Sequence, residues 1–154
     1  MHDGPIYTEY FEDIKLHQQY RSREYFLNEK EIIDFATVWD PQQLHIDKES
    51  AKNTKFGSLV ASGIHLVAIG QKLANEMRPR PAWIAGLGWE KVQFLAPARS
   101  GDVLVLENEV IMKRESESDR SAGIVCYAAR LLNQHNKLVL TYEGTALIER
   151  RHKL

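Results

Sequence analysis

The sequence predicts a single α+β domain in which an antiparallel sheet wraps around one buried helix. Residues 63–77 are apolar on nearly every side of a helix in its first half, so this helix must be covered by other elements. After residue 81 the apolar residues recur with a period of two, which is typical of strands that bury one face. A sheet that curls around the helix buries both.

Length and composition agree with one soluble domain spanning residues 1–154. A chain of 154 residues can bury a core without help from a metal or a disulfide. Charged residues make up 27% of the chain and the net charge is -1, so a nucleic acid partner is not expected. No apolar run approaches a membrane span and the first residues do not resemble a secretory signal. We therefore expect a cytoplasmic protein without a membrane partner, in which the single Cys126 packs as a small apolar residue.

The first elements are predicted from local signals. Residues 1–10 carry no clear period and are expected to form a loosely ordered leading segment, while residues 19–27 favour a first strand. Asn28 and Glu31 form a capping-box pair that should start a helix. Its predicted apolar face contains Ile32, Ile33, Phe35, Ala36 and Trp39, and Pro41 should end it at Asp40.

Between this helix and the central one, the chain is expected to be mostly irregular. The stretch from Pro41 to Leu44 favours a short crossing, which places His45 on a loop. Asp47 is a candidate cap for a brief helical turn over residues 48–52. The central helix should run from Gly63 to Met77 and end before the prolines that follow.

Four long strands are predicted in the second half, over residues 83–95, 103–112, 121–132 and 138–149. Gly101 and Asp102 form one turn signal, and residues 134–137 form another. These turns favour consecutive antiparallel strands joined by hairpins.

Asp40 and His45 are the residues best suited to chemistry. An acid and an imidazole that converge on one cavity can move protons to and from a substrate. The residues alone also allow a structural interpretation, in which Asp40 ends a helix and His45 packs inside the fold. A metal site at His45 and Asp47 is disfavoured, because no matching cluster accompanies them and Asp47 is explained as a cap. No phosphate-binding loop is found, so no nucleotide cofactor is expected.

A larger pattern resembles the MaoC-like dehydratase family, whose members include relatives of the R-specific enoyl-CoA hydratases. The matching positions are Phe35-Ala36, Asp40, Leu44-His45, Asp47, Ala51, Phe56-Gly57, Val60-Ala61-Ser62-Gly63, residues 92–97 and Gly101-Asp102. Their most specific part joins the acid and histidine, five residues apart, to the Phe-Gly and Ser-Gly signals before the central helix. The R-hydratase motif commonly carries Asn-Pro between acid and histidine, where this chain has Gln42-Gln43.

This resemblance implies a hotdog fold, a homodimer or higher homo-oligomer, and the addition of water to a trans-2-enoyl-CoA or its removal from a 3-hydroxyacyl-CoA. The CoA thioester is then a substrate, and no cofactor is implied. Asp40 and His45 match the catalytic pair. Gly63 matches the position whose backbone N–H holds the thioester oxygen, and Ser62 beside it is expected to support substrate binding.

Two other functions remain open at this point. A hotdog thioesterase would direct water at the carbonyl carbon and release a free thiol. A non-catalytic acyl-binding or assembly module would bind ligand without turnover, although the intact acid and histidine disfavour it.

Overall fold

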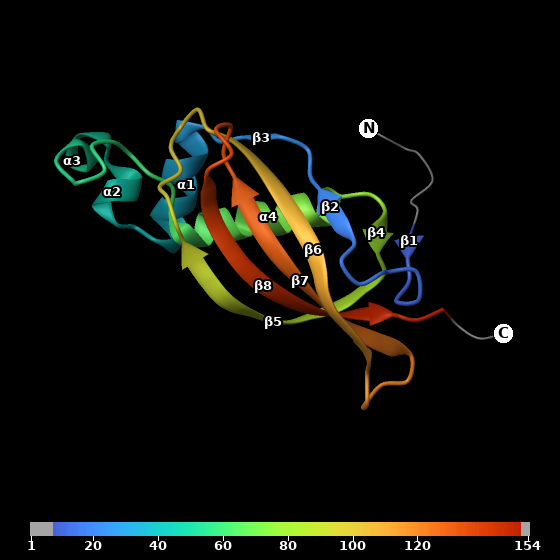
Figure 1. Cartoon of the computed structure of the whole chain (residues 1–154). Coiled ribbons are helices and arrows are strands. Elements are labelled where there is room, and N and C mark those ends of the chain that lie inside the picture. The colour runs from blue at the N-terminus through green and yellow to red at the C-terminus, as the bar shows by residue number, and fades with distance from the viewer. Residues whose placement is uncertain (1–7, 152–154) are drawn as a thin grey trace.

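The computed structural model describes residues 8–151, in which short strands and four helices are followed by four long strands (Figure 1). In chain order they are β1 (Thr8–Glu9), β2 (Gln19–Arg21), β3 (Tyr25–Phe26), α1 (Glu29–Trp39), α2 (Gln43–Ile46), α3 (Lys48–Lys52), α4 (Gly63–Glu76), β4 (Arg80–Pro81), β5 (Trp83–Phe94), β6 (Val103–Glu115), β7 (Ala122–Leu132) and β8 (Leu138–Glu149).

A curved antiparallel sheet holds α4 against its concave side (Figure 1). The strand order is β2-β6-β7-β8-β5, and β3 also pairs with β6. Leu66 and Leu73 of α4 are buried in the same core cluster as Leu106 of β6 and Leu131 of β7. The predicted α+β class and hotdog architecture are therefore confirmed.

The long strands lie where the alternation predicts them, but one predicted connection is wrong. β5 pairs with β8 rather than with β6, so the turn at Gly101 and Asp102 does not form a hairpin. The turn over residues 134–137 does join β7 to β8, with Asn136 at a φ of 55°. The predicted strand over residues 19–27 is split into β2 and β3, which pair with different parts of β6. Alternation predicts that a segment is a strand but carries no information about its neighbour.

The helix before the site begins as the capping box predicts. The Asn28 side chain accepts a hydrogen bond from the Glu31 N–H, and its amide donates to the Glu31 carboxylate. Asp40 is the residue at the C-terminal end, and its N–H donates to the Ala36 carbonyl. The predicted apolar face is wrong at Trp39, whose exposed fraction is 68%.

The next two helices confirm one expectation and correct another. Asp47 caps α3 by accepting hydrogen bonds from the N–H groups of Glu49 and Ser50. His45 lies within α2 rather than on a loop. The sequence did not predict this helix because four residues are too few to show a helical period.

Three further expectations concern the chain as a whole. Residues 1–7 of the leading segment lie outside the described residues, whereas Thr8 and Glu9 pair with β4 and are therefore ordered. Cys126 is buried, as predicted. Within residues 8–151, no helix combines the length and apolar character that a membrane span requires.

Candidate active site

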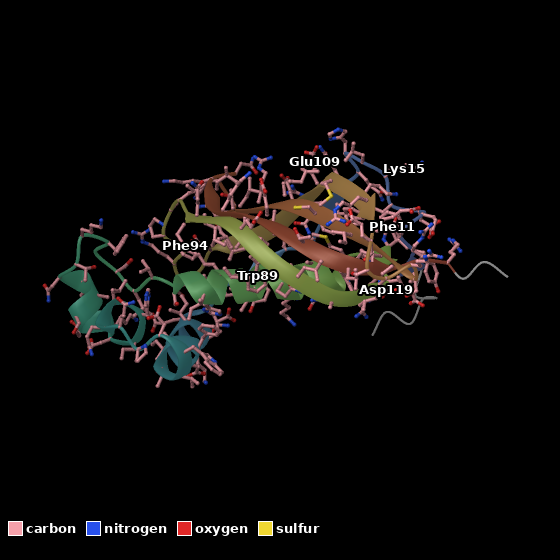
Figure 2. The ribbon with its side chains drawn as sticks, turned by 90° about the horizontal axis from the view of Figure 1, so that it is seen from below. Phe11, Lys15, Trp89, Phe94, Glu109 and Asp119 are labelled. Carbon is pink, nitrogen blue, oxygen red and sulfur yellow. The ribbon has the colours of Figure 1, made fainter. Side chains whose placement is uncertain are left out.

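A cleft of about 700 Å³ opens where α1 and α2 meet the start of α4. Asp40, His45 and Gly63 all line it, so three residues that the sequence separates by up to 23 positions share one cavity. Phe94 and the segment after it form another wall. Figure 2 shows Phe94 at the end of β5 that faces the region of α1, α2 and α3.

The Asp40 carboxylate is held by two side-chain donors. The Ser62 hydroxyl donates to Oδ2 at 2.6 Å, and the Gln42 amide donates to Oδ1 at 2.9 Å. The Ser62 hydrogen bond, followed by that of Gln42, holds the pKa of Asp40 below its ordinary value, and nearby His45 acts in the same direction. Asp40 is therefore a carboxylate at neutral pH.

His45 is oriented by a backbone carbonyl. Its ring is buried, and Nδ1 lies 2.6 Å from the Val60 oxygen. A carbonyl oxygen can only accept, so Nδ1 carries the hydrogen of this bond, and Nε2 is the nitrogen available for proton transfer. Nε2 lies 3.6 Å from Asp40 Oδ2. The pair thus presents a free imidazole nitrogen and a carboxylate oxygen side by side.

The start of α4 places Ser62 and Gly63 beside this pair. Ser62 occupies the N-cap position, but its side chain makes no capping hydrogen bond and instead donates to Asp40. Gly63 is the first helical residue, so its N–H has no acceptor within the helix. A Cβ at Gly63 would lie 2.6 Å from the Phe94 ring, so the close approach of that ring requires glycine. The helix dipole adds partial positive charge here.

Part of the cleft wall is apolar and exposed to solvent. Four side chains that line it are about half exposed or more, namely Trp39 at 68%, Phe94 at 56%, Leu95 at 50% and Ile64 at 49%. Lys55 adds a cation to the same lining. Contiguous exposed apolar side chains are typical of a surface that binds an apolar ligand or another protein.

Two groups in the site were missed from sequence. The Val60 carbonyl orients His45 and carries no signal in the residue type, because every residue has a carbonyl. Gln42 was noted only as a departure from the R-hydratase motif, yet it donates to Asp40. A side chain that can donate, two residues after an acid, was the signal that could have identified it.

Metal binding finds no support in the described part of the chain, where no group of three or more candidate ligand side chains occurs. Asp47 faces the N–H groups of α3 instead. His65, the buried histidine of α4, does not line the cleft and stacks on Phe35 with ring centroids 4.4 Å apart.

The fold and the cleft together define a class of protein. It is a hotdog domain with an acid and a histidine beside the start of its central helix. A family model, the MaoC like domain, matches residues 13–129. The chain belongs to this MaoC-like family, as the sequence pattern predicts.

Similar proteins extend over nearly the whole chain. The uncharacterised protein YdeM of Bacillus subtilis is 29% identical over 140 residues, which cover 90% of this chain and 98% of YdeM. The crystal structure of a MaoC-like dehydratase from Rhodospirillum rubrum superposes with a TM-score of 0.88 at 31% identity, covering 94% of this chain and 99% of that one. The R-hydratase PhaJ1 from Pseudomonas aeruginosa gives a TM-score of 0.76 at 26% identity, covering 94% and 88%.

Proposed function

We propose that this protein is a hydro-lyase that adds water to a trans-2-enoyl-CoA to give a 3-hydroxyacyl-CoA, or catalyses the reverse reaction. The observation that carries the proposal is the pairing of a free His45 Nε2 with the Asp40 carboxylate at 3.6 Å, in a cleft that also contains Gly63. The similarity to an R-hydratase supports the same chemistry.

The pair is suited to activate one water molecule. Asp40 accepts a hydrogen bond from the water, and His45 Nε2 removes a proton as the water oxygen bonds to the β-carbon of the substrate. The double-bond electrons move toward the thioester oxygen and form an enolate. His45 then returns its proton to the α-carbon, so that one water has been added and both side chains are restored. Asp40 stabilises the imidazolium between these steps.

Gly63 supplies the group that the enolate needs. Its N–H, at the positive end of α4, would donate to the thioester oxygen as negative charge develops there. Ser62 contributes through Asp40, because its hydroxyl donates to the carboxylate and favours the ionised form. The exposed apolar walls at Trp39 and Leu95 suit the acyl chain.

The long edge of the sheet supports a homodimer. Among residues 8–151, β5 pairs only with β8 in the sheet, so no described strand lies along its other edge. The exposed side chains along it include Leu87 at 53% and Val92 at 39%. An open, apolar edge strand is a template for pairing with a second copy. We infer that two chains associate along this edge.

The test of the reaction is the loss of enoyl-thioester absorbance after protein is added to short, long and branched trans-2-enoyl-CoAs. We expect turnover of at least one of them. Asp40→Asn and His45→Gln should each lower kcat by about a hundred-fold or more, because the first removes the carboxylate that holds the water and stabilises the imidazolium, and the second removes the group that transfers the proton.

The controls separate the other two functions. Release of free thiol without formation of a 3-hydroxyacyl thioester would indicate a thioesterase. Binding of the thioester without any turnover would indicate an acyl-binding module. Full activity in both variants would remove Asp40 and His45 from the mechanism.

A further inference from the structure

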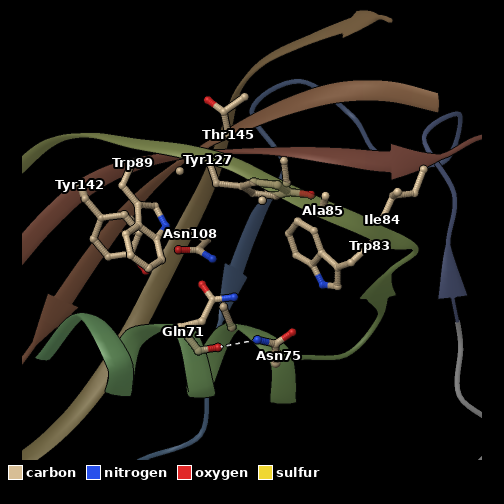
Figure 3. Close-up of a pocket in the computed structure, with 15 residues that line it drawn as sticks. Gln71, Asn75, Trp83, Ile84, Ala85, Trp89, Asn108, Tyr127, Tyr142 and Thr145 are labelled. Atoms are coloured by element: carbon tan, nitrogen blue, oxygen red, sulfur yellow. Dashed lines mark hydrogen bonds between the residues drawn. The ribbon is translucent and has the colours of Figure 1, made fainter. Parts of the chain in front are cut away.

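His65 lies in the first turn of α4, two residues after Gly63, and the proposed reaction makes no use of it. Only 5% of the residue is exposed. It lines neither the Asp40 cleft nor the cavity beside the later part of α4, where Figure 3 shows Gln71 and Asn75. Any effect of His65 on the site is therefore transmitted by the side chains around it.

The imidazole ring of His65 lies against α1. It stacks on Phe35 with the ring centroids 4.4 Å apart and the ring planes inclined by 8°. Glu31, one helical turn before Phe35, lies 3.7 Å from His65 Nε2. The two residues of α1 are four positions apart, so they lie on the same side of that helix. His65 therefore packs against one face of α1 over a full helical turn.

This contact depends on the ring of His65 and not on its nitrogens. Nδ1 is buried without a hydrogen-bond partner among the described residues, and the 3.7 Å between Nε2 and Glu31 Oε1 is too long for a hydrogen bond. Tyr25 and Asn28 donate to the Glu31 carboxylate instead. Burial lowers the pKa of His65 to about 4, so the ring is neutral at neutral pH. Phenylalanine, which is flat and uncharged, should preserve the contact.

The two helices that meet at this stack carry different parts of the candidate site. Phe35 precedes Asp40 by five residues at the end of α1, and His65 follows Gly63 at the start of α4. The hydrogen bond from Ser62 to Asp40, at 2.6 Å, joins the same two helix ends. A hydrogen bond weakens steeply when its distance and angle change, so this one requires a fixed placement of α1 against α4.

We propose that the His65–Phe35 stack is a clamp that fixes the end of α1 against the start of α4 and so holds Asp40 in position. His65 is thus a positioning residue, and its role in turnover rests on the proposed hydratase function. Asp40 and the Gly63 N–H act on the same substrate, and a displacement of about 1 Å can lower a rate about a hundred-fold. Loss of the clamp should therefore lower kcat more than it weakens substrate binding.

His65→Ala removes the clamp, and His65→Phe is the conservative variant that retains a ring. We expect His65→Ala to lower kcat about ten-fold while KM changes by less than about three-fold, and His65→Phe to keep kcat within about two-fold of wild type. The rates are measured on a trans-2-enoyl-CoA and divided by the folded fraction, which circular dichroism gives at the assay temperature. A substitution that only destabilised the fold would leave this corrected kcat unchanged.

Leu73→Ala is the matched control on the same helix. Leu73 is fully buried in the core and lies ten residues after Gly63, so its truncation leaves a cavity far from the start of α4. It should lower the free energy of unfolding at least as much as His65→Ala and leave the corrected kcat within about two-fold. An equal loss of kcat in both variants would overturn the proposal, because general loosening of α4 would then explain it.

Titration of the Asp40 carboxyl carbon by NMR tests the clamp without a substrate. The Ser62 hydrogen bond holds the pKa of Asp40 below its ordinary value, so loosening this bond in His65→Ala should raise that pKa. Phe35→Leu, which removes the other ring but keeps an apolar side chain, should raise it as well, whereas His65→Phe and Leu73→Ala should not.

The two readouts separate this inference from the proposed reaction. A wild type without turnover would contradict the hydratase function, and the Asp40 titration would still decide whether the clamp exists. An Asp40 titration that is unchanged in both His65→Ala and Phe35→Leu would overturn the clamp, even in an active hydratase. A corrected kcat that falls as far in His65→Phe as in His65→Ala would do the same.

Discussion

Asp40 receives two side-chain hydrogen bonds, and the two donors differ in how strongly they lower its pKa. The Ser62 hydroxyl has the larger effect, and the Gln42 amide has the smaller one. Neither donor is required to cap α4, since the Ser62 side chain makes no capping bond. Both are therefore positioning residues whose removal should change the carboxylate more than the fold.

The first prediction concerns Ser62→Ala and Gln42→Ala. Each variant removes a donor that favours the ionised form, so the pKa of Asp40 should rise toward its ordinary value of 3.8, further in Ser62→Ala. Titration of the Asp40 carboxyl carbon by NMR measures this shift. The kcat/KM of Ser62→Ala at neutral pH should fall about ten-fold. An Asp40 titration unchanged in Ser62→Ala would contradict the account.

His65 provides a second titrating group, away from the Asp40 cleft. It is buried against Phe35, and burial lowers its pKa from 6.5 to about 4. Glu31 lies 3.7 Å from its Nε2, and burial raises the pKa of that carboxyl. The histidine is therefore neutral in the folded protein over a range in which it is charged in the unfolded chain.

The second prediction follows from this difference. As pH falls from 6.5 to 4, the unfolded chain gains a proton at His65 that the folded protein does not, so the folded state loses up to about 3 kcal/mol. His65→Phe should lack this loss, whereas His135→Gln, at an exposed histidine, should retain it. Urea unfolding at pH 7 and pH 4.5 measures the difference. Equal losses in wild type and His65→Phe would contradict it.

At the scale of elements, the proposed dimer would give β5 a role beyond the sheet of one chain. Every residue of this strand after Trp83 is exposed, although the strand is twelve residues long. Such a strand is paired with β8 on one side and would gain by pairing along its open edge. The Phe94 end of the same strand forms a wall of the Asp40 cleft, so association along β5 would also bear on the candidate site.

The third prediction tests this edge with Leu87→Lys, since a charged side chain on an edge strand opposes pairing. Wild type should have the mass of a dimer in size-exclusion chromatography with light scattering, and Leu87→Lys should shift toward the monomer. Leu16→Lys is the matched control, because Leu16 is equally exposed, at 50%, but lies outside β5. A monomeric wild type, or an unshifted Leu87→Lys, would show that β5 is not the interface.

Elements with strong local signals could be predicted from sequence. The Asn28 cap, the Asp47 cap and the limits of α4 follow from short-range chemistry, and the structure has them where they are expected. In contrast, the sequence did not predict the one-turn α2 or the exposure of Trp39. A single helical turn has no period, and the burial of Trp39 depends on what lies opposite it in three dimensions.

At the scale of the whole molecule, the antiparallel sheet was predictable but its strand order was not. β5 lies beside β8, which is more than 40 residues away along the chain at the Glu90–Glu143 pair. The candidate site also has features that could be predicted from sequence and features that could not. Asp40, His45 and Gly63 could be named from the pattern of residues, whereas the Ser62–Asp40 bond and the Val60 carbonyl depend on how distant segments meet.

The proposed reaction predicts where an oxygen atom from water must go. In H₂¹⁸O, wild type should place the label on the β-carbon hydroxyl of a 3-hydroxyacyl-CoA whose thioester is intact. Asp40→Asn and His45→Gln should lower the rate of labelling by about a hundred-fold or more. Mass spectrometry of the product from a short trans-2-enoyl-CoA and of any free acid measures both. A label found in a released carboxylate, or a β-hydroxyl labelled equally fast by the variants, would contradict the hydratase mechanism.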